Sequence, residues 1–183
     1  MDLVSRVKNI LLDPQNEWRV IDGEPDPPNV ILKNYVAILA AIPAVCGFIG
    51  SMMIGGRIFT GLIGAIVSYL LTFVGVYLLA FIVYALAPSF AARQDFPSAL
   101  KLVVYAATAS WVAGIFSLIP ALAILSLLLG LYSLYLLYLG IPVLMRAPAD
   151  KSLVYTIVAI VCAAVVWILI GAVPTMLLLG SRF

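Results

Sequence analysis

From Lys33 onward, the chain consists of long uncharged apolar runs that are separated by only a few charged side chains. A helix needs about 20 apolar residues to cross the hydrocarbon core of a bilayer, and these runs supply that length several times. Hydrophobic residues make up 65% of the chain and charged residues 10%, whereas soluble domains average about 45–50% and about 25%. The pattern predicts an all-α polytopic membrane protein.

The boundaries of the apolar runs predict five transmembrane helices. The uncharged run Leu102–Met145 is long enough for two helices if the turn is tight, and Pro120 marks the one plausible turn, because proline favours a helix boundary. One long kinked or re-entrant element remains an alternative for that run, and a four-span count would keep the N-terminus on the same side. The predicted bundle occupies residues 32–183, with spans near 34–56, 62–86, 102–119, 122–144 and 153–179.

The basic residues predict the orientation of the bundle. With five spans, eight basic residues share one side and two, Arg57 and Arg182, lie opposite. Because loops rich in Lys and Arg stay in the cytoplasm, we expect the N-terminus inside and the C-terminus outside. The eight are Arg6, Lys8, Arg19, Lys33, Arg93, Lys101, Arg146 and Lys151.

Residues 1–31 predict a cytoplasmic amphipathic segment. Its first helix carries apolar side chains at helical spacing, so it can lie on the membrane surface, on the ends of the spans or against a partner. After it, Asp13-Pro14 predicts a second short helix, in which the tryptophan is expected to be an interfacial anchor. The predicted membrane or partner surface consists of Leu3, Val7, Ile10, Leu11 and Trp18.

The chain shows no pattern of residues typical of catalysis or cofactor binding. It contains no histidine, and no charged residue falls inside a predicted span. This argues against proton-coupled transport and against acid–base catalysis, both of which need such groups. Cys46 and Cys162 lie in apolar runs without metal-ligand spacing, and a net charge of +2 is too mild to predict nucleic-acid binding. We expect a protein without enzymatic activity, cofactor or metal.

Three tyrosines recur every third residue in the fourth predicted span. In lipid each hydroxyl needs a partner, so the band is expected to face other helices or a cavity. One interpretation is a polar groove for a headgroup or small solute; the other is interhelical hydrogen bonding and an aromatic belt. The predicted groove consists of Tyr132, Ser133, Tyr135 and Tyr138, to which Tyr105 and Ser110 can be added.

Small residues recur at helical spacing in the second and third predicted spans. Such stripes let helix backbones approach closely, and packing drives helix association in lipid. We expect them to pack helices within one subunit, with a dimer interface as the alternative. The stripes consist of Gly61, Gly64 and Ser68, and of Ala106, Ser110 and Gly114.

Several short motifs distributed over almost the whole chain resemble the Yip-domain family of five-span membrane proteins, especially its bacterial branch. The family often has a proline before the tryptophan of the third span, where this chain has Ser110. The matching stretches are Arg6–Leu12 with Pro14 and Glu17-Trp18, Ala85–Phe90, Ala99–Tyr105, Trp111–Ile115, Leu118–Leu122, Gly130–Gly140, Pro142–Met145, Pro148 and Asp150-Lys151.

The resemblance implies five helices, a cytoplasmic N-terminus and, for a bacterial member, the inner membrane. Eukaryotic relatives act in vesicle traffic with Rab-type GTPases. We therefore expect a membrane adaptor or bilayer-organising factor, whose partners are the bilayer, an unidentified membrane or cytoplasmic protein, or a second copy of the chain. The alternative is a passive lipid or small-solute facilitator with a tyrosine-lined groove.

Overall fold

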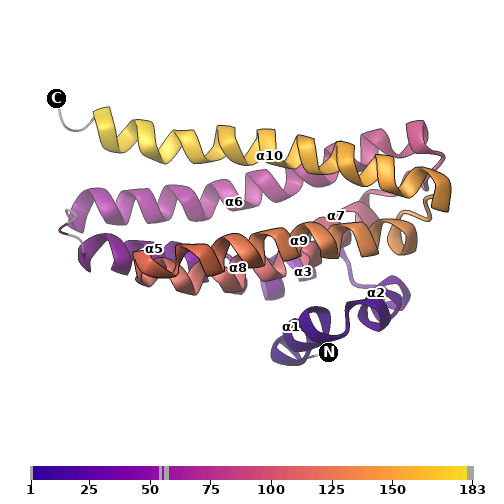
Figure 1. Cartoon of the computed structure of the whole chain (residues 1–183), viewed down its shortest axis with the longest axis horizontal. Coiled ribbons are helices and arrows are strands. Elements are labelled where there is room, and N and C mark those ends of the chain that lie inside the picture. Colours follow the sequence, from indigo (N-terminus) through magenta and orange to yellow (C-terminus); the bar gives the residue numbers. More distant parts are fainter. Residues whose placement is uncertain (1, 54, 56–57, 181–183) are drawn as a thin grey trace.

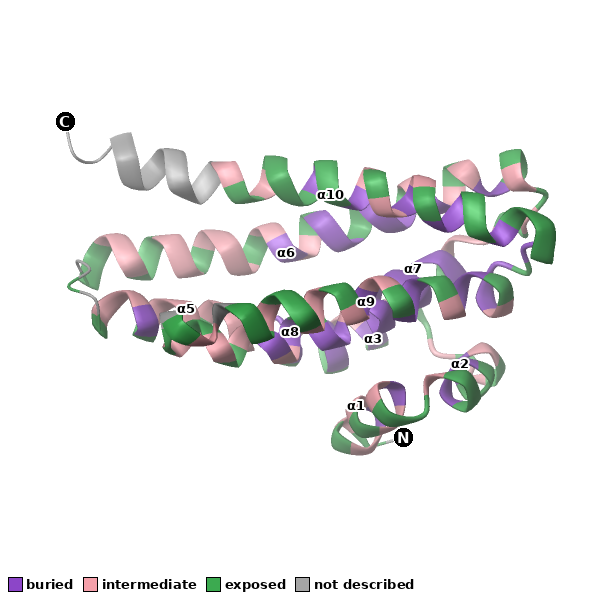
Figure 2. Ribbon diagram, viewed as in Figure 1, coloured by how far each residue is buried: buried purple, intermediate pink, exposed green. Residues whose placement is uncertain are grey.

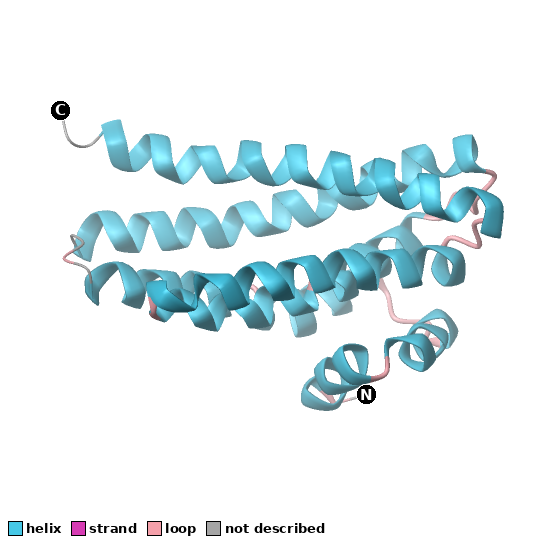
Figure 3. Ribbon diagram, in the orientation of Figure 1, coloured by secondary structure: helices cyan, strands magenta, loops and turns pink. Residues whose placement is uncertain are grey.

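A computed structural model of the chain describes residues 2–53, 55 and 58–180. Over these residues the fold is built from helices joined by short loops (Figure 3). Five helical stretches in them are long and apolar enough to cross a membrane: Pro28–Met53, Ile58–Phe90, Phe96–Leu118, Ile124–Leu144 and Ala149–Ala172. The predicted all-α bundle of five membrane-spanning helices is confirmed.

The spans are assembled from α-helices and short segments of other helix types. Two helices that precede the bundle are α1 (Leu3–Leu12) and α2 (Pro14–Gly23). The first span comprises α3 (Pro28–Ile31), η1 (Leu32–Val36), α4 (Ala37–Leu39) and α5 (Ala41–Met53). The remaining elements are α6 (Ile58–Leu86), η2 (Ala87–Phe90), α7 (Phe96–Ala106), α8 (Thr108–Ala113), η3 (Gly114–Leu118), η4 (Pro120–Leu122), α9 (Ala123–Leu144) and α10 (Ala149–Gly180).

The long helices form two layers (Figure 1). Helices α6 and α10 pack against each other as one layer, and α5, α8 and α9 form the other. The N-terminal helices α1 and α2 lie beside the second layer, where α2 contacts α9 and α1 contacts α8. The bundle thus has one end covered by the N-terminal helices and one end free of them.

Pro43 shapes the first span and its contact with the third. Because proline lacks an N–H and collides with the carbonyl four residues earlier, the helix is interrupted at Ala40, between α4 and α5. At Gly114 the third span passes so close that an added Cβ atom would lie 2.6 Å from Pro43 Cα. The absence of a side chain at Gly114 therefore sets the distance between these two spans.

The third span is not one continuous α-helix. It is interrupted at Ala107, between α7 and α8, and it tightens to a 3₁₀-helix from Gly114 to Leu118. Ile119 has an extended backbone, with φ −128° and ψ 109°, and the chain there turns into the fourth span. Irregular backbone inside a membrane protein is tolerated where it is buried in protein or lines a cavity.

The packed core is concentrated at the end covered by the N-terminal helices (Figure 2). Ser98 to Ala106 of α7 is buried without interruption, and the buried residues of α6 all lie between Thr72 and Val83. The N-terminal half of α6 contributes no buried residue. The two layers therefore pack tightly at one end and more loosely at the other.

Three residues on which two sequence predictions depend fall outside the described residues. Gly56, where the first span was expected to end, is one of them. Arg57 and Arg182, the two basic residues assigned to the outer side, are the others. The orientation of the bundle therefore stays a prediction from the charge count.

Two glycine substitutions test the packing of the spans. We expect Gly114→Ala to lower the free energy of unfolding by about 1–3 kcal/mol, because the new methyl group overlaps the backbone of Pro43. Gly64→Ala is the matched control: its Cβ meets no atom within 4 Å, and the change should be neutral or stabilising by up to about 1 kcal/mol. The measurement is denaturant unfolding in detergent, and equal stabilities would contradict the proposed contact.

Candidate functional site

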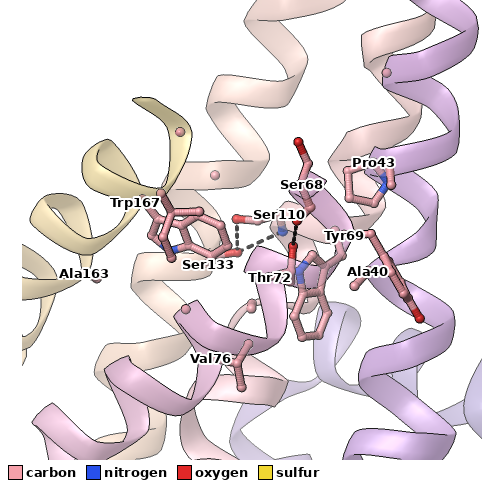
Figure 4. A pocket seen from close by; sticks show the side chains of 18 of the residues that line it. Ala40, Pro43, Ser68, Tyr69, Thr72, Val76, Ser110, Ser133, Ala163 and Trp167 are labelled. Atoms are coloured by element: carbon pink, nitrogen blue, oxygen red, sulfur yellow. Dashed lines mark hydrogen bonds between the residues drawn. The ribbon is translucent and has the colours of Figure 1, made fainter. Parts of the chain in front are cut away.

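A cavity of about 1430 Å³ lies between the two layers of the bundle (Figure 4). Its walls come from all five spans, and on α6 they extend from Thr60 to Leu79. Ala163 and Trp167 of α10 line it on one side, and Ala40 and Pro43 of the first span line it on another. The cavity thus occupies the loosely packed part of the bundle.

The lining of the cavity carries hydroxyl groups but no charge. Every described side chain that lines it is uncharged. Over the part of the chain that the structure describes, no three His, Cys, Asp or Glu residues gather as a metal site. The cavity therefore suits an uncharged molecule. Its hydroxyl groups belong to Ser51, Thr60, Ser68, Tyr69, Thr72, Ser110 and Ser133.

Ser110 and Ser133 form a hydrogen-bonded pair on the wall of the cavity. The Ser110 hydroxyl donates to Ser133 Oγ at 2.8 Å, and the Ser110 backbone N–H donates to the same oxygen at 3.0 Å. Ser133 is only 9% exposed, whereas Ser110 is open to the cavity. The pair joins α8 to α9 three residues after the interruption of the third span at Ala107.

The structure corrects the prediction of a tyrosine-lined groove. Tyr135 and Tyr138 are 45% and 42% exposed on the outer surface of the bundle, and Tyr132 does not line the cavity either. The physical reason is the helical period of about 100° per residue, which puts Tyr135 on the opposite side of α9 from the cavity residue Leu137. Of the predicted groove, only Ser110 and Ser133 line the cavity.

Tyr132 and Tyr105, the remaining tyrosines of the predicted groove, contact the N-terminal helix α1 instead. The Tyr132 hydroxyl donates to the Leu11 carbonyl oxygen at 2.8 Å, close to the end of α1. Tyr105 is 4% exposed, and its ring lies 5.5 Å from the Arg6 guanidinium, within the range of a cation–π contact. Both side chains therefore hold α1 against the bundle.

The predicted small-residue stripes serve two different purposes. Gly61 and Gly114 allow close packing: a Cβ atom at Gly61 would lie 2.9 Å from Met52 Cε of the first span. Gly61 also lines the cavity, together with Gly64, Ser68 and Ala106, and a Cβ atom at Gly64 would meet open space. Part of the pattern that predicted helix packing thus produces the cavity.

The apolar face of the N-terminal segment is covered by the bundle. Ile10 and Trp18 are 0% exposed, and Leu3, Val7 and Leu11 pack against the same core. The prediction that Trp18 is an interfacial anchor is wrong, because its ring lies against Gly140 of α9, where an added Cβ atom would be 2.9 Å away. This face is not free to bind a partner while the helices are docked.

A buried ionic cluster at this contact was missed by the sequence analysis. Arg6 is 4% exposed; it donates to Glu17 Oε1 at 2.6 Å and also to the Glu24 carboxylate. Burial alone would lower the pKa of Arg6, but the hydrogen bond and charge of Glu24, with smaller contributions from Tyr105 and Glu17, raise it above its ordinary value. The guanidinium therefore stays charged inside the cluster.

Lys101 completes the cluster from the third span. It is 8% exposed, and its ammonium group donates to the Ile21 carbonyl oxygen at 3.2 Å and to the Glu24 carbonyl oxygen. These carbonyls lie at the C-terminal end of α2, where a cation is favourable to the helix dipole. One signal in the sequence could have indicated a buried role for Arg6: at spacings of three and four it shares a helix face with Leu3 and Ile10.

Comparisons with known proteins show which protein family the chain matches. Residues 8–170 match the family model described as the Yip1 domain. The chain is also similar to the inner membrane protein YohC of Escherichia coli K12, with 28% identity over 166 residues that cover 84% of this chain and 85% of the relative. The protein of the same name from E. coli O6:H1 matches with the same identity and coverage. No solved structure matches significantly.

Breaking the ionic cluster should release the N-terminal helices. We expect Arg6→Gln to lower the free energy that holds α1 and α2 against the bundle by about 3 kcal/mol, because it leaves the buried Glu17 carboxylate and the partly buried Glu24 carboxylate without their cation. The measurement is hydrogen exchange of the α1 and α2 amides, which should speed up while exchange in α6 stays unchanged. Lys8→Gln is the control, since Lys8 is exposed on the same helix. Equal protection of α1 in the two variants would show that the cluster does not hold the helices.

Proposed function

We propose that this chain, which belongs to the Yip1 domain family of membrane proteins, is a passive facilitator that takes up an uncharged lipid or small solute between its helices. The observation that carries the proposal is the cavity of about 1430 Å³ between the two helix layers. Binding pockets for small molecules usually measure about 300–1,000 Å³, so this space can hold a sizeable ligand.

The chemistry of the cavity supports passive handling without catalysis. Over the described residues, its lining offers hydroxyl groups as hydrogen-bond partners but no carboxylate, amine or imidazole to move a proton or attack a bond. An uncharged lining also avoids the cost of holding ions inside a membrane. A molecule can therefore enter, bind and leave without any chemical step.

The proposal places the protein in the bacterial cytoplasmic membrane, with its N-terminus inside. The name of the E. coli relatives, inner membrane protein YohC, supports the location. The excess of basic residues at one end of the bundle supports the orientation. In this orientation the ionic cluster at the N-terminal helices faces the cytoplasm, and the loosely packed end of the bundle faces outward.

A second proposed function is a membrane adaptor or bilayer-organising factor. It is favoured by the outer side of α1, where Val4 and Leu12 are 69% and 74% exposed and Lys8 is exposed between them. At spacings of four these three residues form one stripe, and an apolar stripe with a lysine suits a protein partner or the surface of an anionic membrane. This surface is separate from the face that was first predicted.

The first proposed function predicts that a non-protein molecule accompanies the protein from native membranes. Mass spectrometry after affinity capture in mild detergent should find it bound to the wild type and lost from Gly64→Leu, because the leucine fills open space in the cavity. Gly23→Leu is the matched control, since an added Cβ atom at Gly23 also meets open space, but outside the cavity. The same molecules in all three samples would contradict the proposal.

The second proposed function predicts that the outer stripe of α1 captures a partner. The double variant Val4→Ser and Leu12→Ser should lose a stoichiometric protein partner, whereas Gln15→Ala, an exposed change on α2, should keep it. Deleting residues 1–12 is a poorer test, because it also uncovers the core of the bundle. Capture that is identical for all variants, or a protein that is captured alone, would count against the adaptor.

A further inference from the structure

We infer that the occupant of the cavity is an uncharged lipid, a hydrocarbon chain that carries a carbonyl or hydroxyl oxygen and no ionised headgroup. This inference rests on the proposed uptake function and names the class of its ligand. It draws on the length of the cavity, on the uncharged side chains of its described lining and on hydroxyl groups there that have a hydrogen bond still to make.

The cavity is as long as a lipid chain requires. Its lining residues on α6 extend from Thr60 to Leu79, and at about 1.5 Å per residue this distance is roughly 29 Å. The hydrocarbon core of a bilayer is about 30 Å thick. The cavity therefore runs along most of the apolar part of the membrane, which suits an extended chain better than a compact solute.

The lining excludes a charged headgroup from the interior of the cavity. Small and apolar side chains provide most of its surface, including Ala65, Val76, Ala106 and Leu137. Among the residues that the structure describes, no Lys or Arg lines the cavity to pair with a phosphate, and no acidic residue lines it to pair with an amine. An ion without a partner is costly to bury, so the polar part of the ligand must be neutral.

The Ser110–Ser133 pair has one hydrogen-bond donor to spare. A hydroxyl has one proton and two acceptor positions, and Ser133 Oγ accepts from both the hydroxyl and the backbone N–H of Ser110. The proton of Ser133 has no acceptor among the described contacts, although its side chain is nine-tenths buried. An oxygen of the ligand would complete this pair.

Ser68 offers a second unused hydroxyl in the same space. Its carbonyl oxygen accepts a hydrogen bond from Thr72 Oγ1 at 2.9 Å, but its own side chain has no hydrogen-bond partner in the described part of the chain. Figure 4 shows Ser68 and the Ser110–Ser133 pair lining the same space between the helices. Each of these hydroxyls can donate to a carbonyl or hydroxyl oxygen, and the apolar lining can hold the chain of the ligand.

Tryptophan fluorescence provides the test, because Trp111 lines the cavity and is only 3% exposed. Trp167 is 42% exposed, so the test uses the full-length protein with Trp167→Phe. A second variant that adds Trp111→Phe gives the signal of Trp18, which lies outside the cavity, and this signal is subtracted. The probes are diacylglycerol and phosphatidylglycerol with identical brominated chains, which quench a nearby tryptophan. We expect saturable quenching of Trp111 by diacylglycerol and little by phosphatidylglycerol, since the two probes differ only in the headgroup.

Two variants locate the binding site. Ser133→Ala should weaken diacylglycerol binding about tenfold, which corresponds to about 1.4 kcal/mol, because it removes the hydroxyl that would donate to the ligand. Tyr135→Phe is the matched control, because it removes a hydroxyl from the outer side of the same helix. Gly64→Leu, which fills the cavity, should abolish saturable quenching.

The outcomes separate this inference from the proposed function. Equal quenching by both lipids, or an unchanged affinity in Ser133→Ala, would overturn the uncharged-lipid class and leave uptake intact. The uncharged-lipid class would also be overturned if neither lipid quenched Trp111 and the capture experiment found a small solute that binds the wild type but not Gly64→Leu. Unchanged capture and unchanged quenching in Gly64→Leu would overturn both.

Discussion

Inside a bilayer no water is available for hydrogen bonding, so every polar group in the spans needs a partner in the protein or in a ligand. Most of the structure follows this constraint. The Tyr35 hydroxyl pairs with Thr108 Oγ1 at 2.8 Å, and the Tyr155 hydroxyl donates to the Val83 carbonyl oxygen at 2.5 Å. Among the described residues, the hydroxyls of Ser68 and Ser133 in the cavity are exceptions, and they are the reason to propose a ligand there.

The charged groups obey the same constraint at one end of the bundle. Arg6 pairs with the carboxylates of Glu17 and Glu24, and Lys101 donates to the backbone carbonyls of Ile21 and Glu24. A buried ionic cluster is weak evidence for net stability, because desolvation offsets much of its attraction. Its clearer consequence is a defined docking position, in which α1 and α2 cover the tightly packed end and leave the cavity end free.

The sequence predicted those features that depend on local composition. Uncharged runs between charged boundaries were enough to identify five spans, because length and hydropathy decide whether a helix can cross a membrane. The interruption of the third span at Ala107 was not predictable, because neither proline nor glycine stands there. It depends on a tertiary contact: the Ser110 backbone N–H donates to Ser133 of another helix. The burial of Arg6 likewise depends on Glu24, eighteen residues further on.

The tyrosine band shows a limit of reasoning from residue type. The expectation that hydroxyls face a cavity was sound for Ser133, but Tyr135 and Tyr138 lie on the outer surface. A tyrosine can satisfy its hydroxyl near the membrane interface because its side chain is long and amphipathic. The helical period could have separated Ser133 from Tyr135, but only tertiary packing decides which side of α9 faces the other layer.

The central claim is that an uncharged chain occupies the space between the two helix layers. An electron cryomicroscopy structure of the protein in nanodiscs made from native lipids tests it most directly. We expect elongated density along α6 that approaches Ser133 and lies between α6, α9 and α10. A cavity closed by direct contact of the layers, or filled with separate water peaks, would contradict the account.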